Sequence, residues 1–87
     1  MDKGQFLMNV EAVANVVYYD EYLTGVIELS DTYKYIAFDE TGAYWMTPKS
    51  GIHYSEQILP PCESNELGEK LLAHIDLSKV TKVYQTC

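Results

Sequence analysis

The sequence contains no arginine, and its six basic residues are lysines that lie far apart along the chain. Proteins that grip phosphate groups usually rely on arginine forks or on clustered lysines. Direct binding to DNA or RNA is therefore not expected. Thirteen acidic residues give a net charge of −7, which favours a basic partner because opposite electric fields steer two molecules together. The same charge could instead serve solubility alone, since small soluble domains often carry a net charge of up to about 8 in magnitude.

Cysteine is also scarce, because Cys62 and Cys87 are the only two. Two are too few for a disulfide framework, so both are expected to be free thiols in a reducing compartment. No apolar run approaches the roughly 18 residues of a membrane span. The first residues also lack the basic region and the uninterrupted apolar stretch of a signal peptide. Together these absences predict a cytoplasmic protein that does not enter a membrane.

Residues that often do chemistry are present, but not at the spacing that chemistry requires. His53, Cys62, His74 and Cys87 are the residue types of a zinc site, yet the chain has neither C-x₂₋₄-C nor H-x₃₋₅-H. Cys62 precedes a predicted helix whose dipole could lower its pKa, but nothing places a histidine beside it. The chain has no glycine-rich phosphate loop. The sequence therefore predicts no enzyme activity, no metal and no cofactor.

The length and composition describe a single domain over residues 1–87, with 47% hydrophobic and 22% charged residues. In its middle, turn signals at residues 24–25, 30–32 and 39–42 separate short β-prone runs, which predicts a meander of antiparallel strands over residues 16–47. Gly42 is expected to take a positive φ in one of these hairpins. Residues 47–51, with a proline and a glycine, are expected to break the sheet.

The two flanks of this meander are predicted with different clarity. Residues 5–19 fit both a helix and a strand, and the run VVYY favours a strand over residues 13–19. After Pro60 and Pro61, Ser64 can N-cap a helix over residues 65–77, and the glycine at position 68 suggests close packing against a strand. The expected fold is therefore α+β. A small antiparallel sheet of three to five strands is covered on one face by one main C-terminal helix.

Eight tyrosines are the most unusual part of the composition. They cannot all be buried, because a buried hydroxyl needs a hydrogen-bond partner, and exposed tyrosine is enriched in protein interfaces. Tyrosine is also a good strand former, so a purely structural reading stays open. Alternation puts Tyr33 and Tyr35 on the face opposite Ile36 and Phe38, while the carboxylates gather at strand ends and turns. The predicted partner-binding residues are Asp20, Glu21, Tyr22, Asp31, Tyr33, Tyr35, Asp39 and Glu40.

One segment carries a family resemblance. Residues 58–79 read ILPPCESNELGEKLLAHIDLSK and contain, in order, ELG at 66–68, a leucine pair at 71–72, Ile75 and Ser78-Lys79. This quarter of the chain resembles the C-terminal stretch of immunity proteins of bacterial contact-dependent growth inhibition systems. The resemblance implies an antitoxin that binds a cognate toxin domain, a nuclease. It assigns no contact residue.

The functional hypothesis is an immunity protein that neutralises a basic toxin nuclease through an acidic, tyrosine-rich surface. Because such a nuclease holds a polyanion, its active cleft is expected to be basic. Three alternatives stay open. One is a phage-type acidic inhibitor that mimics nucleic acid and blocks a nucleic-acid-binding complex. The second is a homodimeric interaction module, and the third is an enzyme that uses Cys62 or a pair of carboxylates.

Overall fold

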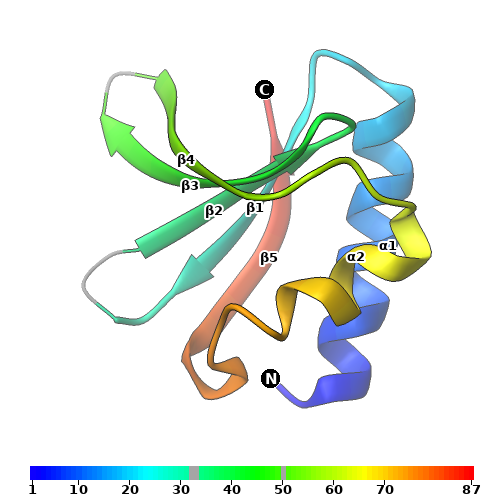
Figure 1. The fold of residues 1–87 in the computed structure, drawn as a ribbon, viewed down its shortest axis with the longest axis vertical. Coiled ribbons are helices and arrows are strands. Elements are labelled where there is room, and N and C mark those ends of the chain that lie inside the picture. The colour runs from blue at the N-terminus through cyan, green and yellow to red at the C-terminus, as the bar shows by residue number, and fades with distance from the viewer. Residues whose placement is uncertain (32–33, 50) are drawn as a thin grey trace.

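The structure, a computed structural model, describes residues 1–31, 34–49 and 51–87 (Figure 1). Five strands form one antiparallel sheet in the order β4-β3-β2-β1-β5, so that β5 returns along the free side of β1. The fold is α+β, as predicted. Its elements in chain order are α1 (Lys3–Tyr19), β1 (Thr24–Leu29), β2 (Lys34–Asp39), β3 (Gly42–Lys49), β4 (Gly51–Leu59), α2 (Ser64–Leu71), the 3₁₀ turn η1 (Leu77–Lys79) and β5 (Val80–Thr86).

The hydrophobic core lies between the helices and one side of the sheet. Ile27 pairs with Ile36 across β1 and β2, and Phe38 pairs with Ala43 across β2 and β3, so these side chains share one side. They form a single buried cluster with residues of α1 and α2. The helical members are Phe6, Val10, Ala14, Leu67 and Leu71. Figure 1 accordingly shows the strands to one side of α1.

Helix α1 corrects the prediction of a strand over residues 13–19. Its N-cap Asp2 accepts a hydrogen bond from the backbone N–H of Gln5 at 2.8 Å, which satisfies one of the free donors of the first turn. Buried residues follow at helical spacing along its inner side. Burying this stripe in the core outweighs the local β propensity of VVYY, which is a weak preference.

The prediction of one main C-terminal helix is also wrong, because the longer helix is the N-terminal α1. Helix α2 ends at Leu71, and its N-cap is Glu63 rather than Ser64, without a side-chain cap. Asp76 accepts from the backbone N–H of Ser78 at 3.0 Å, so the following residues turn into η1 instead of continuing the helix.

Two predicted glycine roles have different outcomes. Gly42 has a φ of +132°, as expected for its hairpin, and a Cβ there would lie 2.3 Å from the carbonyl oxygen of Leu59. Gly68 is buried at a close contact, but its neighbour is a helix rather than a strand, since a Cβ there would lie 2.8 Å from Cδ2 of Leu7 in α1. The predicted break over residues 47–51 is wrong for residues 47–49 and 51, because β3 runs to Lys49 and β4 starts at Gly51, while residue 50 lies outside the described residues.

The second side of the sheet carries tyrosines. Tyr35 lies there, as the alternation predicts, opposite Glu28 on β1 and Met46 on β3. Tyr44 and Tyr54 stack with ring centroids 4.6 Å apart.

Within residues 1–31, 34–49 and 51–87, neither helix is long and apolar enough to span a membrane.

Candidate partner-binding site

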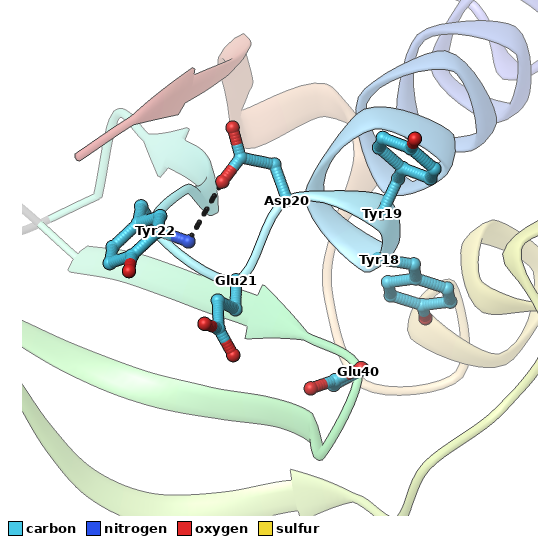
Figure 2. A pocket seen from close by; sticks show the side chains of 6 residues that line it. All are labelled: Tyr18, Tyr19, Asp20, Glu21, Tyr22 and Glu40. Atoms are coloured by element: carbon cyan, nitrogen blue, oxygen red, sulfur yellow. Dashed lines mark hydrogen bonds between the residues drawn. The ribbon is translucent and has the colours of Figure 1, made fainter.

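Two adjoining hollows lie at the end of the molecule where α1 ends and β2 turns into β3. The first has a volume of about 400 Å³, and the second, of about 440 Å³, shares Tyr18 and Glu40 with it. We call the two together the acidic hollow. Figure 2 shows the first, which is lined by Tyr18, Tyr19, Asp20, Glu21, Tyr22 and Glu40. The second adds Pro61, Cys62, Glu63, Glu66 and Lys70.

Tyr18 lines both hollows and lies between them. It lies in the last turn of α1, and its hydroxyl donates a hydrogen bond to the carbonyl oxygen of Cys62 at 2.9 Å. That bond holds the segment after the two prolines against the end of the helix. Burial, helped by the neighbouring Cys62, raises the pKa of Tyr18 to about 12. The phenol therefore stays protonated and keeps donating at neutral pH.

The link from α1 to β1 is shaped by Asp20. The backbone N–H of Asp20 still bonds to Val16, which ends the helix, and its Oδ1 accepts from the backbone N–H of Tyr22 at 3.0 Å (Figure 2). This Asx turn reverses the chain before β1. It leaves Tyr22 79% exposed, while Tyr19 in the helix end is 94% exposed. Two large aromatic side chains thus stand in solvent beside carboxylates.

The β2–β3 turn is built by Asp39 and contributes Glu40. Oδ1 of Asp39 accepts from the backbone N–H of Thr41 at 2.8 Å and from the Thr41 hydroxyl, and Oδ2 accepts from the hydroxyl of Tyr54 at 3.0 Å. Both oxygens of Asp39 are therefore engaged within the fold. The neighbouring Glu40 is exposed and lines both hollows.

The acidic hollow carries more than half of the net charge of the molecule. Five carboxylates and one lysine line it, which gives −5 + 1 = −4 against −7 for the chain. The lysine, Lys70, lies 3.7 Å from Glu66. The negative end of the α1 dipole points to the same place, without a basic residue in its last turn. Within the described ranges, four carboxylates of the hollow are in no ion pair, those of Asp20, Glu21, Glu40 and Glu63.

The structure brings together half of the predicted partner-binding residues. Asp39 lies next to the first hollow but is bonded within its turn. Asp31 lines a separate hollow at the opposite end of the sheet. Tyr35 lies on the second side of the sheet. Tyr33 falls outside the described residues. The four that line the first hollow together are Asp20, Glu21, Tyr22 and Glu40.

Seven further residues line the acidic hollow without being among the predicted partner-binding residues, namely Tyr18, Tyr19, Pro61, Cys62, Glu63, Glu66 and Lys70. Tyr18 and Tyr19 are missed because a strand is predicted over residues 13–19, although the helical spacing of the apolar residues is the signal for their position. Cys62, Glu63 and Glu66 come from a segment more than forty positions along the chain from Tyr18. Only packing of α1 against α2 brings these two segments together.

In the described residues, the geometry supports neither a reactive Cys62 thiol nor a metal site. Burial is the largest cause that raises the pKa of the Cys62 thiol above its usual value, so the lowering that a helix dipole could produce does not prevail, and the thiol is protonated at neutral pH. His74 lines the separate hollow around Trp45 rather than the acidic one. Among residues 1–31, 34–49 and 51–87, no group of three or more histidine, cysteine, aspartate or glutamate side chains could hold a metal ion.

Comparisons with models of known protein families, with curated protein sequences and with solved structures returned no match.

Proposed function

We propose that this protein binds and neutralises a basic partner protein, the nuclease domain of a bacterial toxin, and that the acidic hollow is its contact surface. One observation carries the proposal. Four carboxylates without an ion pair in the described part of the chain surround a hollow beside the strongly exposed Tyr19 and Tyr22. The family resemblance of residues 58–79 supports an immunity role, and α2 and its flanking residues place part of that segment in the wall of the hollow.

We expect the carboxylates to raise the association rate and the tyrosines to supply most of the affinity. Clustered like charge raises the on-rate for an oppositely charged partner, because the field guides the encounter. Affinity comes mainly from a few large side chains that lose water in the complex, and tyrosine is among the most frequent of these. Tyr19 and Tyr22 have the exposed area for that role. A nuclease cleft offers the matching chemistry, since it must hold phosphates with cationic side chains.

The test uses neutral variants that keep the shape of the surface. The hollow variant combines Asp20→Asn, Glu21→Gln and Glu40→Gln in one protein, where the asparagine can still accept the Tyr22 bond. Each protein is immobilised to capture partners from the source cell, and the captured protein is identified, purified and tested for nuclease activity. The matched control replaces three exposed carboxylates that do not line the acidic hollow, by Glu11→Gln, Asp31→Asn and Glu56→Gln.

The expected partner is a basic nuclease that the wild type and the control inhibit and the hollow variant does not. Its association rate with the wild type should fall at least about tenfold from low to high salt, since exposed charges are screened within about 8 Å at physiological ionic strength. Equal inhibition by the hollow variant, or an association rate that is flat with salt, would refute the proposal. A toxin gene beside the gene for this protein would support immunity, whereas a phage early region would support a nucleic-acid mimic.

A further inference from the structure

The side of α1 that faces away from the sheet carries a row of exposed apolar residues. Met8, Val16 and Tyr19 are 68%, 41% and 94% exposed, and Ala12 between them is exposed as well. At about 100° per residue, all four lie on the side away from the buried stripe of the helix. Six large hydrophobic side chains are exposed in the described part of the chain, so half of them lie in this one row. Apolar residues scattered singly need no explanation, but a contiguous row marks a contact site.

The residues of this row have the spacing and the sizes of a helix–helix contact. Positions 8, 12 and 16 are four apart and position 19 follows three later, so each side chain neighbours the next along the helix. A ridge of residues four apart fits the grooves of a second helix in the commonest helix crossing. The shorter Ala12 and Val16 lie in the middle, and the long Met8 and Tyr19 lie at the ends. We call these four residues the α1 stripe.

We propose that the α1 stripe binds the α1 stripe of a second copy of this chain, with the two helices antiparallel. A twofold axis midway between Ala12 and Val16 pairs each Ala12 with the second copy's Val16, so the backbones can approach closely. The same axis brings each Met8 to the second copy's Tyr19, a thioether against an aromatic ring, which is a favourable contact. The stripe is therefore complementary to itself, as an isologous interface requires. Tyr19 is also proposed above as a contact for the basic partner, so the second copy and the partner exclude one another at this side chain.

Charge also favours a second copy at this face. Each molecule carries −7, so two copies repel one another except where acidic residues are few. Between its caps, α1 has one acidic residue, Glu11, and the other neighbours of the stripe on the outward side, Gln5 and Asn15, are uncharged. The antiparallel arrangement directs the positive N-terminal end of one helix dipole toward the C-terminal end of the other, where Asp20 and Glu21 lie. The two carboxylates that follow α1 thereby lie toward a positive dipole end.

The size of the contact predicts its strength. A helix of 17 residues is about 26 Å long, and a contact between two such helices buries less than the roughly 1,200 Å² of a standard interface. The dimer should therefore be weak, and its fraction should rise with protein concentration. Figure 1 shows α1 at the side of the molecule, with the strands on its other side. Two copies can therefore meet there without disturbing the sheet.

The first experiment measures molar mass by sedimentation equilibrium from about 10 μM to about 1 mM, the range in which weak contacts are populated. The wild type should move from monomer to dimer. Ala12→Glu places a charge in the centre of the stripe but keeps a good helix former, so it should stay monomeric with an unchanged circular dichroism spectrum. Asn65→Glu adds the same charge at an exposed position of α2 and should dimerise like the wild type.

The second experiment tests the register, in a chain where both native cysteines are replaced by serine. A mixture of Ala12→Cys and Val16→Cys proteins should form disulfide dimers faster than either protein alone. Faster cross-linking of Ala12→Cys with itself would indicate parallel helices and overturn the arrangement.

Two results would overturn self-association through this face. The wild type could stay monomeric over the whole range, or Ala12→Glu could dimerise as the wild type does. If the wild type stays monomeric and the Ala12→Glu variant also loses the captured basic partner, the stripe is assigned to that partner instead. Because molar mass is measured without the partner, failure here leaves the role of the acidic hollow to its own test.

Discussion

At the scale of single residues, two polar side chains, Asp39 and Tyr18, shape the acidic hollow through hydrogen bonds within the fold. The sequence predicts Asp39 as a partner contact, but both of its oxygens accept hydrogen bonds from its own hairpin and from Tyr54. It does not predict Tyr18, which links α1 to the chain after Pro61 through the carbonyl of Cys62. A carboxylate whose two oxygens already accept hydrogen bonds within the fold is poorly placed to bind a partner. A half-buried phenol with one donor is well suited to holding two segments together.

Replacing Tyr18 with phenylalanine should lower the free energy of unfolding by about 1 kcal/mol, because the Cys62 carbonyl loses a donor and the ring remains. The change should also alter how the free energy of unfolding decreases with rising pH in the alkaline range. Tyrosine has an ordinary pKa of 10.0, and burial raises the pKa of Tyr18 to about 12. Between those values the unfolded chain has lost this proton and the folded chain keeps it. The contribution of Tyr18 is therefore complete below pH 10 and is lost as the pH rises toward 12.

Urea unfolding from about pH 9 to about pH 11 checks this sign. The wild type should lose more stability over that interval than Tyr18→Phe. The pKa values of Tyr54 and Tyr84 are raised as well, but both proteins share those residues, so the difference isolates Tyr18. Parallel curves for the two proteins would contradict a raised pKa at this position.

At the scale of elements, the contact between α1 and α2 positions the acidic hollow. Gly68 allows this contact, because the glycine in α2 faces Leu7 and Val10 of α1 at short range. Glycine is unfavourable inside a helix by about 1 kcal/mol relative to alanine, so its presence needs a packing reason. The crowding that a Cβ would meet supplies that reason.

Gly68→Val should destabilise the fold by roughly 1–3 kcal/mol, because the branched side chain would be forced into a packed helix–helix contact. Glu69→Val is the matched control, since it puts the same residue at the next position, which is exposed. It removes only a surface ion pair with Lys3, so its effect should be within about 0.5 kcal/mol. Urea midpoints of the two variants measure the difference. Equal midpoints would mean that α1 and α2 are not packed closely at Gly68.

At the scale of the whole molecule, charge is distributed unevenly. A net −4 of the total −7 surrounds the acidic hollow, beside the negative end of the α1 dipole. Like charges around one hollow repel, and carboxylates at a helix C-terminus are unfavourable by about 0.3–1 kcal/mol each. This arrangement works against folding, which is the cost expected where a surface is kept for binding.

The hollow variant Asp20→Asn, Glu21→Gln, Glu40→Gln should therefore be more stable than the wild type at low salt, by about 1 kcal/mol in total. The gain should shrink in about 1 M salt, where charges are screened beyond roughly 3 Å. Thermal melts of both proteins at low and high salt measure it, with the three-residue control variant alongside. A lower melting temperature for the hollow variant would show that these carboxylates stabilise the fold instead.

The amino-acid sequence alone specifies the fold class, the positive φ of Gly42, the side on which Tyr35 lies and three strands of the meander, although the turn predicted at residues 24–25 lies within β1. These features rest on short-range signals, namely alternation with period two and turn residues between β-prone runs. The negative charge and the tyrosine content are likewise properties of composition.

Long-range packing sets the remaining features. Residues 13–19 have local β preference, but burying one face of α1 against the sheet makes them helical, so Tyr18 and Tyr19 come to the rim of the acidic hollow. The predicted binding residues are divided between the two ends of the sheet, because Asp31 precedes β2 and Asp39 is the last residue of that strand. The segment after Pro61 joins Glu40 in the same way. Local sequence carries no information on such contacts, because they form between segments that are distant along the chain.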